Sequence, residues 1–498
     1  MIWVIYPIMH RSKAGRTGHP SSRALQPDSI EVTSMLASSI SAFQTFKMSV
    51  GPSSSHTHGP IVIGNLFRRF LAKNSQFHDF AGIKITLCWS LARTGKGHMT
   101  NNAILAGLLG YDPVKDDLAL INGALARVSE LGQLDLGVKT VPFNPAKHMV
   151  WSPYKRLPGH ENGLNLSLIN HKSEVVLSKN YYSIGGGMVR EEGFTEEDRA
   201  ANEPYPYRKA SEWLVFAKNM GVPLSEIVKR NTAALEHLSV PETVARMNGI
   251  WQTMKGCVER GLHPAEAVLP GVLRVKRRAP MLMEAAIKPK RRGIFASNDI
   301  CRYATAFAYA VSEENAASGR VVTAPTNGGA GVLPGVMYAS QYLDDFSDDE
   351  VVEVLFTAAG IGGLIQANAS ISGSEVGCQG EVGAACSMAA GAVCQLFEGS
   401  IGDVEYAAEI AMEHSLGLEC TPMKGYVQIP CIERNGIFAQ KALAAAQHAI
   451  TLKDHRISLD LVINKMYENG KALHTDFKET SRAGFGPMEP DLNDPFPV

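Results

Sequence analysis

Residues Ser374 to Arg434 begin SEVGCQGEVGAACSM and end LGLECTPMKGYVQIPCIER, and this stretch holds five of the eight cysteines of the chain. Cys386 and Cys394 lie in AACSMAAGAVCQLF. That run of small apolar residues predicts a buried helix, where a free cysteine behaves as a small hydrophobe. The remaining three adjoin glycines or prolines, which predict turn-like backbone that can aim a thiolate: Cys378, Cys420 and Cys431.

Three aimed thiolates suggest a metal centre. Their separations are 42 and 11 residues, and the chain contains no C-x-x-C pair, which argues against a zinc ribbon or knuckle. Soft thiolate ligands without regularly spaced histidines suit an iron–sulfur cluster better. Three protein ligands would leave one metal position open for catalysis. The alternative, that all these cysteines are reduced core residues, stays open at this point.

Two motifs in the first half of the chain carry histidines. SVGPSSSHTHGP, Ser49 to Pro60, places hydroxyls and His56 just before an amphipathic segment that predicts a helix. Serine-rich backbone at a helix N-terminus can bind an anion such as a carboxylate, although most such stretches are simply turns. LARTGKGHMT, Leu91 to Thr100, is a glycine-bracketed loop with Lys96 and His98, which could either contact a substrate or be solvated.

A third polar motif, RVVTAPTNGGAG, spans Arg320 to Gly331. Proline and glycine break it into a loop, and its Thr326 and Asn327 side chains can each hydrogen-bond a carboxylate or an amine. From the residues alone, an ordinary loop is the alternative.

Together these motifs resemble the iron–sulfur L-serine dehydratases, over about Met35 to Arg482. The catalytic part of that family resembles EVGCQGEVGAACSMAAGAV, MEHSLGLEC, VQIPCIERN and RVVTAPTNGGAG, and its smaller N-terminal domain resembles SVGPSSSHTHGP, LARTGKGHMT and YYSIGGG. The resemblance implies a [4Fe–4S] cluster on three cysteines and L-serine bound at the open iron. It assigns the cluster to Cys378, Cys420 and Cys431.

The resemblance also suggests roles for the polar residues. β-Elimination needs a base for the Cα proton, and we choose His56 first and His98 second. The residues assigned to substrate binding are Ser54, Ser55, Lys96, Thr326 and Asn327. The chain departs from many relatives at Met99, where a second histidine is common, in the Gly328–Gly331 loop, where a cysteine is common, and in a tail without cysteine.

Composition limits the class of protein. The 498 residues, 45% hydrophobic and 19% charged, allow two or three soluble globular domains. A net charge of −1 argues against nucleic acid or an anionic membrane as partner, and no apolar stretch approaches the ~20 residues of a membrane span. Eight unevenly spaced cysteines suit a reducing cytoplasm better than a secreted disulfide framework. We expect a homodimer with L-serine as its small-molecule substrate.

The predicted fold class is an α+β N-terminal domain followed by a mostly α-helical catalytic domain. Residues 1–34 read as an extension that we expect to be disordered, 35–190 as the α+β domain and 191–215 as a linker, because Glu191 to Lys209 is charged and has no apolar period. Residues 216–485 form the predicted helical, cluster-binding domain, and 486–498 a proline-rich tail.

Two other functions fit parts of the pattern. A pyridoxal-phosphate-dependent lyase would use the turn Gly185–Gly187 as a phosphate cup, but no lysine has a recognisable Schiff-base setting. A non-enzymatic iron–sulfur redox sensor would need a DNA- or partner-binding module, and the sequence suggests none.

Overall fold

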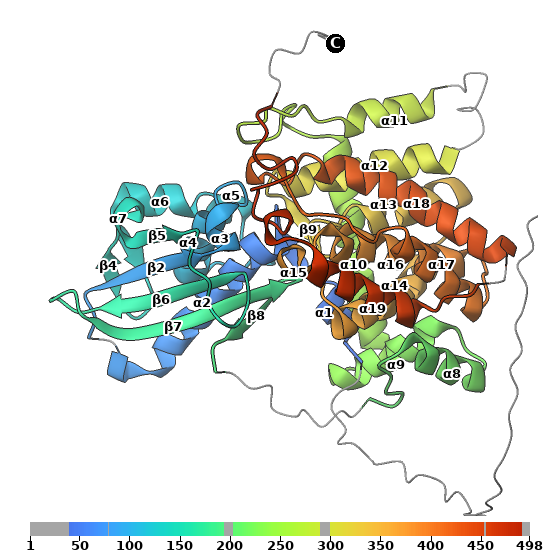
Figure 1. The fold of residues 1–498 in the computed structure, drawn as a ribbon, viewed down its shortest axis with the longest axis horizontal. Helices are drawn as coiled ribbons and strands as arrows, with labels where there is room; N and C mark the ends of the chain where they lie inside the picture. Colours follow the sequence, from blue (N-terminus) through green and yellow to red (C-terminus); the bar gives the residue numbers. More distant parts are fainter. Residues whose placement is uncertain (1–38, 78, 194–202, 289–298, 453–454, 491–498) are drawn as a thin grey trace, which may run out of the picture. The chain divides into compact units, whose positions relative to one another are not determined.

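A computed structural model describes residues 39–77, 79–193, 203–288, 299–452 and 455–490 (Figure 1). The extension predicted for 1–34 lies outside the described residues, as do most of the 486–498 tail and part of the 191–215 linker. Within the linker range, helix α8 begins at Ala210.

The N-terminal region is built on a five-stranded sheet in the order β5-β2-β6-β7-β8. β2 pairs parallel with β5, and the other neighbours pair antiparallel. The strands are β2 (Gly82–Cys88), β5 (Met149–Ser152), β6 (Gly163–Ile169), β7 (Val175–Gly185) and β8 (Met188–Glu191). A separate hairpin joins β3 (Gln133–Asp135) to β4 (Thr140–Pro142). The sequence of β2, GIKITLC, is rich in apolar and β-branched residues, a composition typical of a strand.

Helices of this region share one apolar core with the sheet, and the longest of them are α2 (Gly59–Lys73) and α4 (Thr100–Leu109). α2 is amphipathic and buries Ile61, Ile63 and Phe67, with Pro60 in its first turn where no intrahelical N–H bond is lost. The shorter helices are α3 (Ser90–Arg93), α5 (Leu118–Asn122), α6 (Ala124–Leu131) and α7 (Pro145–His148).

The N-terminal segment before this sheet packs into the helical region instead. Helix α1 (Ala42–Thr45) and Phe46 belong to the core formed by the later helices. Strand β1 (Met48–Val50) pairs antiparallel with β9 (Arg320–Val322), and Ser49 lies opposite Val321. The turn that follows β1 therefore starts from a strand held by the helical region, which brings the serine–histidine motif to it.

The rest of the chain is almost entirely helical, as expected. Its long helices are α8 (Ala210–Met220), α9 (Leu224–Leu235), α10 (Val240–Leu262), α11 (Ala279–Ile287), α12 (Asp299–Ala316), α13 (Val332–Asp344), α14 (Asp348–Asn368), α16 (Val382–Leu396), α17 (Ile401–Glu413), α18 (Cys431–Leu452) and α19 (Leu459–Ala472). The short helix α15 (Gly373–Val376) precedes α16. Ser239 and Glu242 form a capping box at the start of α10. The α+β-then-helical fold class is confirmed.

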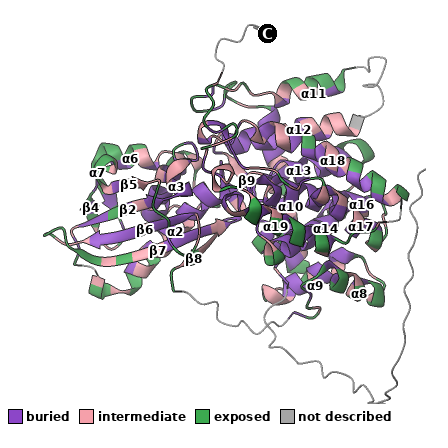
Figure 2. Cartoon of the chain, viewed as in Figure 1, coloured by how far each residue is buried: buried purple, intermediate pink, exposed green. Residues whose placement is uncertain are grey.

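Helix α16 is the buried centre of this region (Figure 2). It contacts α13, α14, α17 and α18, and both Cys386 and Cys394 are fully buried on it, as predicted. Small residues permit these close approaches: a Cβ on Gly391 would come within 2.2 Å of the side chain of Ile361 on α14.

Helix α14 contradicts the prediction that no apolar stretch approaches the length of a membrane span. Among the described residues it alone is long and apolar enough to cross a membrane, whereas the sequence analysis found no stretch of that kind. In the structure, 78% of its most apolar window is buried inside the protein. A helix that packs against protein on all sides has apolar residues on every face. Burial in the protein therefore explains the apolar composition of α14, and no membrane is required.

The contact between α2 and α4 supports a stability prediction. A Cβ on Gly107 would lie 2.1 Å from the carbonyl oxygen of Ile61, which is backbone and cannot move aside. We expect Gly107→Ala to lower the free energy of unfolding by ~1–3 kcal/mol, measured by chemical denaturation. Gly249→Ala on α10 is the matched control, because a Cβ there meets nothing within 4 Å and gains helix propensity. Equal stability of the two variants would contradict the packing argument.

Candidate functional site

One cavity brings together residues from both regions of the chain. Pro52, Ser53 and His98 come from the N-terminal region, and the other lining residues come from the helical region: Gly328, Cys378, Glu381, Cys420, Thr421, Pro422, Val427, Pro430, Cys431, Arg434 and Glu479. The three cysteines selected by the sequence analysis thus share a cavity, and Cys386 and Cys394 are not among its lining residues.

The three cysteines are held by different local structures. Cys378 begins the short 3-10 helix Cys378–Gly380, and Cys420 lies in a loop that forms an isolated bridge with Lys478. Cys431 is the first residue of α18, so the prediction of turn-like backbone is wrong there. The helix begins directly after Pro430. The first N–H groups of a helix have no intrahelical partner, which makes this position favourable for a thiolate.

The electrostatics around the sulfur atoms combine burial with one cation. Burial raises the pKa of all three thiols, and for Cys420 the carboxyl groups of Glu381 and Glu479 raise it further. The guanidinium of Arg434 opposes this for Cys378 and Cys431. Arg434 also donates to the backbone oxygen of Glu419 at 2.7 Å, which fixes the cation beside the sulfur atoms.

Glu381 lies between the cysteine loop and the Thr326 loop. Its Oε1 accepts a hydrogen bond from Thr326 Oγ1 at 3.2 Å, and its Oε2 is 3.6 Å from Cys420 Sγ. Burial raises the pKa of Glu381 to about 7, although the Cys420 and Thr326 hydrogen bonds and Arg434 favour the charged form. The carboxyl group can therefore exist in either protonation state near neutral pH.

The two predicted histidines meet at a third group, Glu479. Their ring centroids are 4.6 Å apart. Glu479 Oε1 lies 3.3 Å from His56 Nδ1 and 3.6 Å from His98 Nε2. His98 lines the cavity, whereas His56 is fully enclosed and does not belong to its wall.

Burial governs the ionisation of this group. It lowers the pKa of His98 to about 4, and burial together with the neighbouring His98 lowers the pKa of His56 well below its ordinary value. Burial and the nearby Glu381 raise the pKa of Glu479 well above its usual range. Both imidazoles are therefore neutral at physiological pH, which is the form that can accept a proton.

The predicted substrate-binding residues are divided by the structure. Thr326 donates to Glu381, which lines the cavity, but Thr326 is not itself a lining residue. Ser54 and Ser55 are buried in the Ser54–His58 turn. Ser55 Oγ lies 2.9 Å from His56 Nδ1, so Ser55 contacts the histidine pair rather than the cavity. Asn327 is buried with its amide engaged by the protein, accepting from Ser49 Oγ and donating to Asn315 Oδ1.

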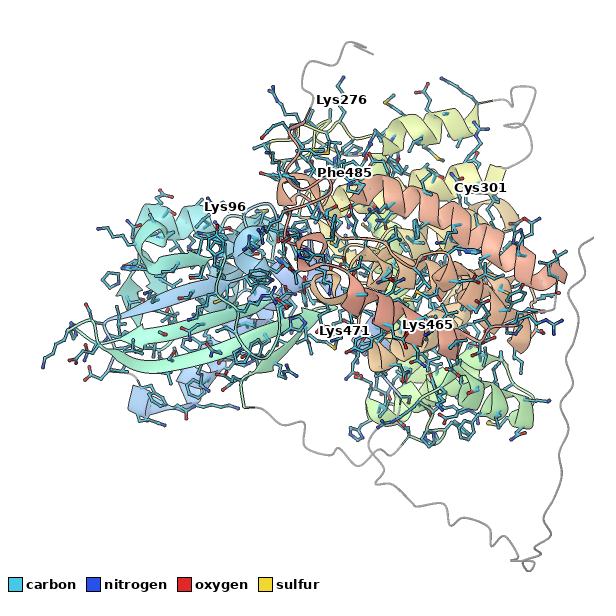
Figure 3. All side chains as sticks on the ribbon, in the orientation of Figure 1. Lys96, Lys276, Cys301, Lys465, Lys471 and Phe485 are labelled. Atoms are coloured by element: carbon cyan, nitrogen blue, oxygen red, sulfur yellow. The ribbon has the colours of Figure 1, made fainter. Side chains whose placement is uncertain are left out.

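Lys96 lies elsewhere. It is exposed, its Nζ is 5.8 Å from the ring centroid of Trp151, and it lines a separate hollow on the N-terminal region (Figure 3). Gly95 and Gly97 flank Lys96, and the loop turns between them so that His98 points inward and Lys96 outward. A Cβ on Gly97 would lie 2.4 Å from the backbone oxygen of Gly425, which shows how closely this loop meets the helical region.

Three residues of the cavity were not singled out by sequence reasoning: Glu381, Arg434 and Glu479. Glu381 and Arg434 each lie three residues from a cysteine, Cys378 and Cys431, so their proximity was a usable signal. Glu479 lies in KETSR near the C-terminus, and no local pattern distinguishes it. Only the fold brings it to the histidines.

The turn Gly185–Gly187 closes a hairpin. Gly185 pairs with Met188, and Gly186 and Gly187 have φ values of 55° and 73°. These are the conformations of a tight two-residue connection between antiparallel strands, where glycine is favoured. The turn thus has a structural explanation that requires no phosphate.

The donor set of the cavity fits an iron–sulfur cluster. Three thiols that are costly to ionise alone, two of them buried and that of Cys431 half-buried, line one cavity. A cationic cluster, Arg434 and the first turn of α18 would together offset the charge of three thiolates. A zinc site with these residues would mix sulfur and carboxylate ligands without the usual closely spaced cysteine pairs.

Comparison with known proteins identifies the family of the chain. Residues 41–194 match the family model of the serine dehydratase beta chain, and residues 219–486 that of the serine dehydratase alpha chain. L-serine dehydratase 1 of Escherichia coli is 44% identical over 455 residues, covering 89% of this chain and 98% of the relative. The L-serine dehydratases of Haemophilus influenzae (41%) and Streptomyces coelicolor (42%) are similar over the same 89% of this chain and 98% of their own length.

The buried histidines predict a pH dependence of stability. His98 has a pKa of about 4 in the folded chain and about 6.5 when unfolded. The unfolded chain therefore binds more protons between these values, and stability falls as the pH drops from about 6.5 towards 4. We expect His98→Asn to reduce the loss of unfolding free energy between pH 7 and pH 5, measured in urea at both values. An unchanged loss would show that His98 titrates normally in the folded protein.

Proposed function

Since the chain belongs to the serine dehydratase family, with its beta-chain and alpha-chain parts fused in one polypeptide, we propose that it converts L-serine to pyruvate and ammonia at a [4Fe–4S] cluster held by Cys378, Cys420 and Cys431. The lyase activity follows from the family, and the cluster is the part proposed here. Its main support is the convergence of three cysteines, Cys378 and Cys420 buried and Cys431 half-buried, on a cavity that also contains His98.

The reaction has two chemical demands. The Cα proton of serine is weakly acidic, and hydroxide is a poor leaving group. When bound, the cluster supplies a Lewis acid, which makes the serine hydroxyl a better leaving group. The protein residues must orient the substrate, take the Cα proton and exclude water.

We assign the base to His98 and place His56 behind it, which reverses the preference of the sequence analysis. His98 lines the cavity, and its Nδ1 donates to the Thr94 backbone oxygen at 2.9 Å, so Nε2 carries the lone pair. The Cα–H bond breaks, Nε2 takes the proton, and the electron pair forms the Cα=Cβ bond as hydroxide leaves. The proton then passes from Nε2 to the hydroxide, which gives water and restores neutral His98. The enamine becomes an imine, which water hydrolyses to pyruvate and ammonia.

For substrate binding, we now favour groups that reach the cavity. Arg434 is a fixed cation suited to a carboxylate, and Thr326, through Glu381, helps to define the polar wall. Ser54, Ser55 and Asn327 are better placed to support the cavity from behind. We do not assign Lys96 to substrate binding, because its side chain is exposed beside Trp151.

The remaining expectations form part of the same proposal. We propose a cytoplasmic homodimer acting on free L-serine, without nucleic acid or membrane partners, and with domain limits at 35–190 and 216–485. A reducing compartment would keep the eight cysteines free, and all eight lack disulfide partners in the structure.

The cluster assignment predicts unequal roles for the cysteines. In protein prepared without oxygen, Cys378→Ser, Cys420→Ser and Cys431→Ser should each lose most bound iron and serine turnover. Cys394→Ala and Cys386→Ala should keep both, because burial in α16 raises the pKa of these thiols to about 12 and they do not line the cavity. Iron and sulfide counts with a pyruvate assay measure this. Full iron in Cys420→Ser would refute the ligand set, and a yellow, air-stable protein would favour the pyridoxal alternative.

The base assignment predicts a kinetic change. His98→Ala should lower kcat by ~10²-fold or more while iron content stays normal, because an acid–base group typically contributes 10²–10⁴-fold. His56→Ala should lower kcat less, because His56 does not line the cavity. Steady-state kinetics per mole of cluster distinguishes the two, and a larger loss in His56→Ala would restore His56 as the base.

A further inference from the structure

Glu479 connects the cysteine loop to the histidine pair. Its backbone N–H donates to the oxygen of Cys420 at 2.7 Å, and the N–H of Cys420 donates to the oxygen of Phe477 at 2.9 Å. The residue is 3% exposed and has φ of 53°, a left-handed conformation unusual for a residue with a side chain. Such strain persists only where the surroundings enforce it, and it often marks functional positions.

The hydrogen bonds around the histidines define which ring nitrogens face Glu479. Ser90 Oγ has one proton and donates it to the backbone oxygen of Glu479 at 2.8 Å. Ser90 Oγ must therefore accept from His56 Nε2, which lies 3.1 Å away, so His56 carries its proton on Nε2.

His98 is locked in the complementary way. Its Nδ1 lies 2.9 Å from the backbone oxygen of Thr94, which can only accept, so this nitrogen carries the proton. The lone-pair nitrogens of both rings, His56 Nδ1 and His98 Nε2, are thus the atoms near Glu479 Oε1. The same oxygen, Oε1, faces the basic nitrogen of each imidazole, so a protonated Glu479 can donate to His56 Nδ1 and can accept from His98 Nε2 once that nitrogen carries a proton.

We propose that Glu479 is a positioning residue for the elimination, which holds the two imidazoles in this tautomeric arrangement and stabilises the proton that His98 takes from the substrate. The inference rests on the proposed function. The Cα–H bond breaks, the N–H bond forms at His98 Nε2, and the resulting imidazolium has a carboxyl oxygen 3.6 Å from its new proton-bearing atom. In a buried site, such a partner lowers the energy of a charge that develops during the reaction.

This arrangement assigns a second role to the C-terminal segment. Thr475–Phe477 forms a 3-10 turn that leads into Lys478 and Glu479, and Lys478 bridges to Cys420. The same short segment is therefore attached to a proposed cluster ligand and to the proposed base. The reaction centre is incomplete until the backbone of Phe477 to Glu479 has paired with Cys420 and the Glu479 side chain has reached the histidines.

The test compares Glu479→Gln and Glu479→Ala with the wild type in oxygen-free holoenzyme. We expect kcat for L-serine to fall about tenfold to a hundredfold, more for alanine than for glutamine, since the amide keeps the shape and can donate to a ring nitrogen. KM and the iron count should stay within about threefold of wild type. The deuterium isotope effect on kcat with L-serine labelled at Cα should rise, because proton removal becomes rate-limiting.

A matched control lies on the same segment. Asp476 pairs with Arg482 at the surface, and Asp476→Asn should leave kcat and the isotope effect unchanged. Should the Glu479 variants lose the cluster, Ser90→Ala decides, because it removes the acceptor that fixes the His56 tautomer and leaves the Glu479 side chain in place, although the bond from Ser90 to the Glu479 backbone oxygen is also lost. We expect Ser90→Ala to show the same lower kcat and higher isotope effect.

An unchanged isotope effect in the Glu479 variants with normal iron, or in Ser90→Ala, would overturn the role of Glu479. That result would leave the proposed function intact, because the wild type would still turn over L-serine with its iron. Wild-type protein that turns over L-serine without iron would instead refute the cluster and not the positioning role.

Discussion

The packing of α16 against α18 determines where the chemistry can occur. Glu381 precedes the first residue of α16 and Cys431 is the first residue of α18, and both line the same cavity. The two helices contact each other along small residues, so their N-terminal ends are held together. Free N–H groups at helix starts favour negative charge, which supports thiolates in a buried place that would otherwise disfavour them.

The same constraint explains the apolar interior of the helical region. α14, α16 and the α1 segment pack so closely that glycines replace larger residues at the contacts; a Cβ on Gly362, for example, would lie 2.8 Å from Thr45. Close-packed interiors transmit the position of one element to its neighbours. A rigid helical frame can therefore hold the three cysteines, which come from a 3-10 helix, a loop and the start of a helix, at fixed positions around a cavity.

The N-terminal region contributes the imidazoles, and the frame holds it through two attachments. β1 pairs with β9, which leads into the Thr326 loop, and Glu479 reaches from the C-terminal segment to both histidines. Ser90 and Glu479 are bonded across 389 residues of sequence. The site is thus assembled from the beginning, middle and end of the chain, a common property of sites where ligand pockets form between structural units.

Local sequence patterns were sufficient to predict much of the secondary structure and burial of this protein. The small-residue run around Cys386 and Cys394 predicted a buried helix because side-chain size and apolarity decide burial within one element. Glycine and proline neighbours separated Cys378, Cys420 and Cys431 from that helix, although the backbone of Cys431 proved helical. The capping box at Ser239 and the strand from Gly82 were likewise readable, since both depend on residues close in sequence.

Tertiary structure decided what depends on distant partners. Which histidine faces the cavity depends on the contact between the Gly97 loop and Gly425, and the outward direction of Lys96 follows from the same contact. The engagement of Asn327 by Ser49 and Asn315 required the β1–β9 pairing. Glu479 has no local signature because its role comes from a backbone contact with Cys420 and from two rings of the N-terminal region. Hydrogen-bond partners and burial are properties of the folded chain, and they set the protonation states on which the chemistry depends.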